Sequence, residues 1–204
     1  MYAIVESGSI TKTFNNPRKL VINNIRYSTK IFSLWSEAEK KAIGLYEVEY
    51  DNTNKKDEAW YINTNQTLTY DASANKVTAS YGTATAKAIA DVNAVDENGD
   101  PLLDSNGDQI VTKGLKTVKK EMIKNQCAGI LAPSDWRVVR AKETGGTMNS
   151  GWKTWRASVR TKCNSMQTQI DNATNVDDLA ALFTYTEQED GSVTRPLGEF
   201  PVKE

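Results

Sequence analysis

Two short runs of alternating oxygen-bearing residues, Asp96–Asp100 and Asp104–Asp108, are the part of the chain that most resembles a ligand site. Both follow the pattern Asp-x-Asn-x-Asp, which is typical of calcium loops because oxygens at alternate positions surround a hard cation. The glycine, however, stands at the fourth position instead of the sixth, and no glutamate occupies the twelfth. Aspartate is also favoured in tight turns, where it bonds to nearby backbone. The two runs therefore predict tight turns, with calcium binding as the alternative.

Catalytic chemistry has few candidates in this chain. Histidine is absent, which removes the side chain used most often for acid–base catalysis and as a metal ligand. The two cysteines, Cys127 and Cys163, fall on the apolar faces of two predicted helices, so we interpret them as buried small hydrophobic residues. The acidic groups that could serve acid–base work stand in polar surroundings: Asp57-Glu58, Asp177-Asp178 and Glu187, Glu189 and Asp190. The sequence favours a protein that is not an enzyme, with no cofactor and no metal; a histidine-independent enzyme is the distant alternative.

The charge balance gives no field that would attract nucleic acid or an anionic membrane, because 25 basic residues face 26 acidic ones. The stretch Lys113–Lys124 is basic and could track phosphates, but its lysines lie opposite Leu115 and Ile123, so we favour a solvated helix face. The first residues lack a signal-peptide pattern, and no uncharged apolar run is long enough to cross a membrane. We expect a soluble protein with neither a nucleic-acid nor a membrane partner.

Residues 1–92 have the texture of a strand-rich domain. Short apolar or alternating runs separated by Asn- and Ser-rich turns predict a meander of antiparallel strands. One short helix is predicted over Glu37–Ile43, because Ser36 and Glu39 form a capping box and Gly44 stands at the C-cap. Leu34 or Trp35 should pack this helix against the sheet.

The remainder divides into a linker and a helical domain. Residues 93–113 form a polar ribbon whose two Asn-Gly pairs predict a β-hairpin. Residues 114–204 change to helical periodicity, with one helix ended by Pro133, a long helix through Trp152 and Ile170, a short third helix after Asn175, and an extended tail. The predicted fold class is α+β: an N-terminal antiparallel sheet with one short helix, a hairpin linker and a C-terminal helical hairpin.

Three tryptophans, Trp136, Trp152 and Trp155, lie within twenty residues of one another. Tryptophan is enriched both in protein cores and at interaction hot spots. Two helices and a short third helix cannot bury three indoles without help from another surface. The excess indicates an interface in the helical domain.

The run from Ile130 to Gly145, with its Asp135-Trp136 step, followed by Trp152-x-x-Trp155-Arg156, resembles a C-terminal module of tail fibre assembly proteins and related tail proteins of tailed phages. The resemblance covers about a fifth of the chain. It implies a helical hairpin in which Trp136 plugs the turn and the Trp155-Arg156 step faces the first helix. The first half, through Ile31–Trp35 and Ile43–Tyr46, is similar to virion-associated phage proteins.

The resemblance leaves two hypotheses open. In the first, the chain is a permanent component of a phage tail, neck or fibre base, present as a homo-oligomer or in several copies and made in the host cytoplasm. In the second, it is a chaperone that binds the C-terminal end of a fibre during assembly and then leaves. In either case the partners are other phage tail or fibre proteins, and Trp136, Trp152, Trp155 and Arg156 are the residues expected to bind a partner or organise the module.

Overall fold

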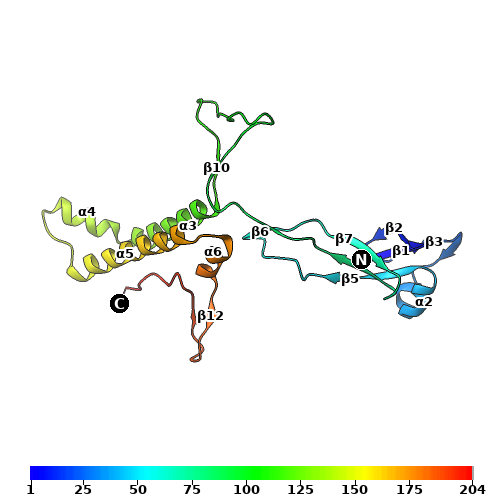
Figure 1. Ribbon diagram of the computed structural model, residues 1–204. Coiled ribbons are helices and arrows are strands. Elements are labelled where there is room, and N and C mark those ends of the chain that lie inside the picture. The colour runs from blue at the N-terminus through cyan, green and yellow to red at the C-terminus, as the bar shows by residue number, and fades with distance from the viewer. Residues whose placement is uncertain (204) are drawn as a thin grey trace. The chain divides into compact units, whose positions relative to one another are not determined.

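The computed structural model describes residues 1–203, which form two compact units divided between Thr85 and Ala86 (Figure 1). The first unit is built on a sheet, and the second contains the three longest helices. The mixed α+β class is confirmed. The ribbon at 93–113 belongs to the second unit.

The first unit has a five-stranded sheet in the order β2-β1-β5-β8-β7. Its strands are β1 (Tyr2–Glu6), β2 (Ser9–Phe14), β5 (Leu45–Asp51), β7 (Thr67–Asp71) and β8 (Lys76–Ser80). Neighbours pair antiparallel except β5 and β8, which are parallel.

The expected meander is therefore wrong at the β5–β8 pair. Val77 and Ala79 of β8 have no exposed surface, whereas residues of β7 alternate between exposed and half-buried. An apolar strand is best placed where neighbours cover it on both sides, and the more polar strand suits an edge. In the sheet, β7 therefore occupies the edge, and β8, which follows it in the sequence, pairs between β5 and β7.

Alternation along the strands divides the buried residues of this unit into two clusters. Ile4 and Leu45 face a cluster covered by the hairpin β3 (Leu20–Ile22)–β4 (Ile25–Tyr27) and by α1 (Ile31–Leu34). Their neighbours along the strands point to the opposite face, because successive side chains alternate. That second cluster contains Ala3, Tyr46, Val48, Val77 and Ala79.

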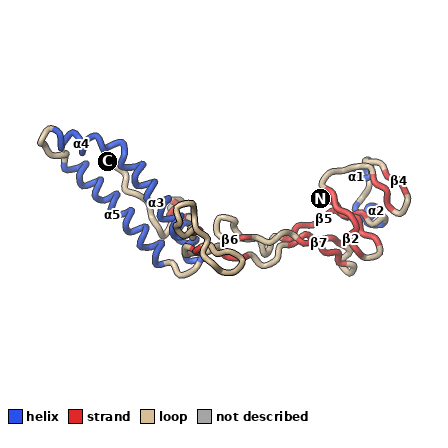
Figure 2. Tube along the Cα trace, turned by 90° about the horizontal axis from the view of Figure 1, so that it is seen from above, coloured by secondary structure: helices blue, strands red, loops and turns tan. Residues whose placement is uncertain are grey.

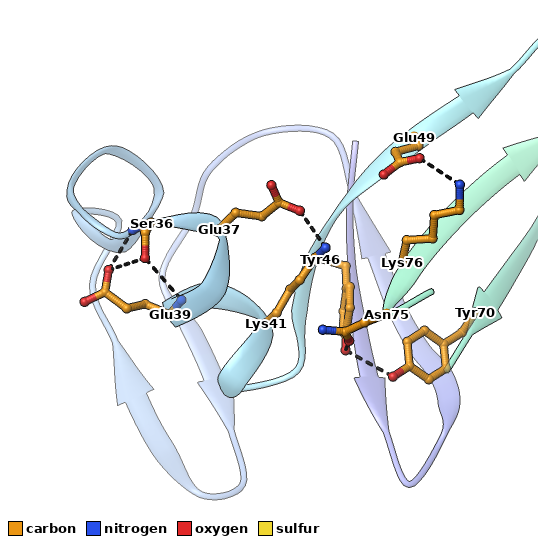
Figure 3. Close-up of polar contacts among 9 residues, drawn as sticks. All are labelled: Ser36, Glu37, Glu39, Lys41, Tyr46, Glu49, Tyr70, Asn75 and Lys76. Atoms are coloured by element: carbon orange, nitrogen blue, oxygen red, sulfur yellow. Dashed lines mark hydrogen bonds and ion pairs between the residues drawn. The ribbon is translucent and has the colours of Figure 1, made fainter. Parts of the chain in front are cut away.

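Helix α2 (Glu37–Ala42) forms as predicted, with a complete capping box (Figure 3). The Glu39 N–H donates to Ser36 Oγ at 3.3 Å, and the Ser36 N–H donates to Glu39 Oε2 at 2.7 Å. Trp35 packs edge-on against the Tyr27 ring at 5.7 Å, whereas Leu34 is exposed. Trp35 is therefore the residue that attaches this segment to the sheet domain.

In the second unit, α3 (Leu115–Leu131) and α5 (Ser150–Asn172) lie side by side as an antiparallel hairpin (Figure 2). A 3-10 turn (Ala132–Ser134) leads into α4 (Asp135–Glu143), and α6 (Val176–Phe183) follows α5. Helix α3 ends at Leu131, two residues before Pro133, as the sequence predicted. Proline lacks an N–H but fits the first turn of a helix, so Pro133 lies in the 3-10 turn and the chain continues into α4, a helix that the sequence analysis did not predict.

The hairpin core is formed by apolar residues at helical spacing, as predicted: Leu115, Ile123, Cys127 and Leu131 from α3, and Val159, Cys163, Met166 and Ile170 from α5. Both cysteines are free and buried, which confirms their interpretation as core residues. Burial, and then a hydrogen bond with Cys163, raise the pKa of Cys127 to about 11.

The C-terminal tail returns along α5 in extended form. The Leu197 side chain is fully buried, and its carbonyl accepts a hydrogen bond from Lys162 Nζ at 2.9 Å. Further on, the Trp155 indole N–H donates to the Pro201 carbonyl at 2.9 Å. The remaining short strands of the chain are β6 (Tyr61–Ile62), β9 (Thr85–Ala86), β10 (Val92–Asn93), β11 (Val111–Thr112), β12 (Thr186–Glu187) and β13 (Val193–Thr194).

The turn after α2 depends on a glycine. Gly44 has a φ of +79°, and a Cβ there would collide with the Val5 carbonyl oxygen. We expect Gly44→Ala to destabilise the first unit by more than Gly8→Ala, which shares the positive φ but has open space around it. A left-handed conformation alone costs about 1–2 kcal/mol in both variants. The additional loss of unfolding free energy in Gly44→Ala is then due to the collision with Val5. Urea unfolding of both variants measures the difference, and equal losses would contradict the role of the Val5 contact.

Candidate functional site

Helix α4 has no buried residue, although it carries large apolar side chains. Trp136 is 51% exposed, and Val138 and Val139 are exposed on the same helix. Single exposed apolar residues are common on surfaces, but Trp136 and Val139 stand three residues apart and so share one face of α4. This helix is the strongest candidate for a contact surface in the second unit.

The Arg137 guanidinium lies between two indoles. Its Cζ is 4.5 Å from the centre of the Trp136 ring and 4.4 Å from that of Trp152 on α5. Stacking of this kind favours arginine because the planar cation meets the negative face of each ring. The arrangement holds the planar head of Arg137 while its N–H edges remain available to another group.

A shallow pocket of about 170 Å³ opens beside this stack. Trp136, Arg137, Arg140 and Trp152 line it, together with the α4–α5 loop, and no carboxylate is among the lining residues. Within residues 1–203, neither the Arg137 guanidinium nor the Arg140 guanidinium forms a hydrogen bond or an ion pair. The four residues, here called the Trp–Arg site, thus combine apolar surface with two uncompensated positive charges.

Arg156, on α5, holds the start of α4 in place. The Arg156 side chain is almost completely buried, and its guanidinium donates to the Leu131 carbonyl at 2.8 Å, to Ser134 Oγ, and to Asp135 Oδ1 at 2.5 Å. These acceptors are the end of α3, the 3-10 turn and the first residue of α4. One side chain on α5 therefore fixes the path of the chain from α3 into α4.

The indoles behind the site are ordered by the tail. Trp152 and Trp155 meet edge to face, with ring centres 5.5 Å apart. Trp155 is half-buried and bonded to the tail at Pro201, while Lys203 Nζ lies 5.6 Å from the Trp152 ring. The tail thus braces the Trp152 ring on which Arg137 stacks.

The four residues singled out from the sequence take different places. Arg156 is a buried organising residue, Trp155 braces the tail, and Trp152 forms one wall of the site. The expectation that Trp136 plugs the turn was wrong, because the Arg156 guanidinium and Ser134 fill that turn and leave the indole outside. Sequence reasoning missed Arg137 and Arg140; the signal was a Trp-Arg step with a second arginine three residues later, on one side of a helix.

We expect Arg156→Met to lower the free energy of unfolding by about 2–3 kcal/mol, because it leaves buried polar groups at Leu131 and Ser134 without their partner. Asp135 is 59% exposed, so its ion pair is screened and Asp135→Asn should cost less than about 1 kcal/mol. Arg160→Met, at an exposed position of the same helix, is the matched control. Chemical denaturation followed by circular dichroism measures all three. A loss in Arg156→Met no larger than in Arg160→Met would contradict the organising role.

The aspartate runs of the ribbon build turns. Asp96 Oδ1 accepts the backbone N–H groups of Asn98 and Asp100 at 2.8 and 2.9 Å, and Asp104 repeats this eight residues later with Asn106 and Asp108. In place of one hairpin, the ribbon has a stem and two tight loops. No cluster of three or more metal-binding side chains occurs in residues 1–203.

Three carbonyl groups converge at the base of these loops. The N–H groups of Ala94, Leu102 and Ile110 donate in a closed ring, to the carbonyls of Ile110, Ala94 and Leu102 respectively. Gln109 Nε2 lies 2.8–3.1 Å from all three carbonyl oxygens. This ring, with no buried core, gives the exposed ribbon its shape.

The backbone N–H groups lower the pKa of both carboxyls below the ordinary 3.8, through Asp100 and then Asn98 at Asp96, and through Asp108 and then Asn106 at Asp104. A lowered pKa in the folded turn means that its stabilisation is present above 3.8 and is lost as the pH falls through the lowered values. Carboxyl carbon shifts followed by NMR should give midpoints below 3.8 at both residues. Asp96→Ala should also speed exchange of the Asn98 and Asp100 amides, whereas Glu97→Ala should not. A midpoint above 3.8 at either carboxyl would contradict this account.

The basic stretch on α3 is largely engaged within the chain. Lys116 Nζ donates to the Asp171 carbonyl at 2.8 Å, and Lys120 pairs with the Asp171 carboxylate at 2.7 Å. Lys113 pairs with Glu121 at 2.6 Å. Lys116 and Lys120 therefore hold the start of α3 to the end of α5. The interpretation of this stretch as a solvated helix face did not include these contacts.

No protein-family model, curated protein or solved structure matches this chain. Among the described residues, no helix combines the length and apolar character that a membrane crossing requires.

Proposed function

We propose that this chain is a non-enzymatic structural protein of a tailed-phage virion, located in the tail, neck or fibre attachment region and acting by protein–protein contacts. The observation that carries the proposal is the Trp–Arg site on α4. It is a partner-binding surface on a helix that the chain itself leaves uncovered.

The composition of the site supports contact with another protein. Tryptophan and arginine are the residues most enriched at interaction hot spots, since each combines large contact area with directional bonding. Trp136 supplies exposed apolar area, and Arg137 is already stacked, so little side-chain entropy is lost on binding. The preformed site therefore suits recognition of a folded partner surface.

The resemblance to the tail fibre assembly module supplies the biological setting. The residues that carry it, from Ile130 to Arg156, are the same residues that build the turn and α4. The first unit, Met1–Thr85, provides a separate surface for attachment to the particle. On this proposal the chain is made in the host cytoplasm and is present in several copies in the virion, with tail or fibre proteins as partners and no role for nucleic acid or membrane.

Mass spectrometry of gradient-purified phage particles tests the proposal. We expect the chain at a fixed stoichiometry, and we expect Trp136→Ala combined with Arg137→Ala to reduce its incorporation at least about tenfold, because loss of two hot-spot side chains commonly costs more than 1.4 kcal/mol. Val92→Ala, at a comparably exposed position outside the site, is the control and should be incorporated normally.

Two results would contradict the proposal. Absence from particles with abundance in the infected-cell lysate would make the chain an assembly chaperone. Normal incorporation of the Trp136 and Arg137 variant would show that α4 is not the contact surface.

A further inference from the structure

The second unit carries an acidic projection as well as the basic Trp–Arg site. Strands β12 and β13 form a hairpin that extends away from the helices (Figure 1). Glu187, Glu189 and Asp190 lie on it, and residues 184–194 contain no basic side chain. Within residues 1–203, the carboxylates of Glu187 and Glu189 form no hydrogen bond or ion pair.

This hairpin is a preformed element. The Gln188 N–H donates to the Ser192 carbonyl at 2.8 Å, and the Gly191 N–H donates back to Gln188 at 3.0 Å. Gly191 has the positive φ that the turn requires, and Asp190 Oδ1 accepts the Ser192 N–H at 2.9 Å. The two free carboxylates are therefore presented by a defined turn.

Apolar surface accompanies the charges on both elements. On the hairpin, Val193 is 61% exposed, while at its base the Tyr185 ring is covered on one side by Arg195, which is paired with Glu199. On α4, the exposed Trp136 lines the same pocket as Arg137 and Arg140. Each surface thus offers two uncompensated charges of one sign flanked by apolar area, and the signs are opposite.

We propose that the acidic hairpin of one copy docks on the Trp–Arg site of a second copy, with Glu187 and Glu189 paired to Arg137 and Arg140 and with Val193 against Trp136. The inference rests on the proposed function, because it names the occupant of the same α4 surface. The two surfaces are different patches of one chain, so the contact is heterologous and repeats head to tail. Such contacts close into rings where the rotation allows it.

The strength of the contact follows from its size and exposure. One hairpin against one short helix covers less than the roughly 800 Å² per partner of a standard interface. Exposed ion pairs are also screened by salt. Association should therefore be micromolar or weaker and salt-sensitive, becoming complete where copies are held close together in an assembly.

Analytical ultracentrifugation of the full chain tests the docking. From about 5 to about 500 µM, the weight-average mass of the wild type should rise with concentration. The rise should diminish between about 0.05 and about 0.5 M salt, as the Debye length shortens. A wild type that stays monomeric throughout overturns the proposal.

Charge reversal identifies the surfaces. Arg137→Glu with Arg140→Glu, and separately Glu187→Lys with Glu189→Lys, should each abolish self-association, and an equimolar mixture of the two should restore it because one native contact can form between them. Glu97→Lys with Asp100→Lys makes the same change of charge on the ribbon and should associate like the wild type. Circular dichroism melting shows that each variant folds.

Unchanged association in either reversed variant, or no association in their mixture, overturns the docking. Particle incorporation separates the two proposals. If the wild type is monomeric but Trp136→Ala with Arg137→Ala is excluded from particles, α4 binds a different phage protein and the proposed function stands. If that variant and the hairpin variant Glu187→Lys with Glu189→Lys are both incorporated normally, the proposed function also fails.

Discussion

The helical unit depends on the Arg156 guanidinium, which joins three segments that would otherwise meet only through backbone. It satisfies the carbonyl at the end of α3 and the hydroxyl of the 3-10 turn, and it reaches the first carboxylate of α4. A charged group is stable in such a place only when it is paired and hydrogen-bonded, because an unsatisfied buried charge is costly. The direction of α4, and with it the exposure of Trp136, follows from this arrangement.

The same constraint separates structural from surface arginines. Arg156 forms its hydrogen bonds with groups inside the protein. Arg137 is held instead by stacking on Trp136 and Trp152 and keeps its N–H edges accessible. Stacking orders the cation without neutralising it. A positive charge held on apolar surface is the feature of α4 on which the proposed contact depends.

Much of the fold could be predicted from local pattern. The capping box at Ser36 and Glu39, the helical spacing from Trp152 to Ile170 and the burial of both cysteines were each visible in the residues alone. The candidate site was predicted only in part, because Trp136 and Trp152 were identified while Arg137 and Arg140 were missed. Exposed arginines have no periodic signature; their role appears only when a second helix brings Trp152 beside them.

What the sequence by itself determined is where helices and turns begin, since caps, Asn-Gly pairs and apolar spacing act over a few residues. Tertiary structure alone decided the parallel pairing of β5 with β8, the continuation of the chain through Pro133 into α4, and the outward position of Trp136. Each of these depends on competition between distant groups for a buried place: β8 displaces β7 from the centre of the sheet, and Arg156 displaces the Trp136 indole from the turn. Local propensity does not encode that competition, because its outcome depends on which partner fills the space.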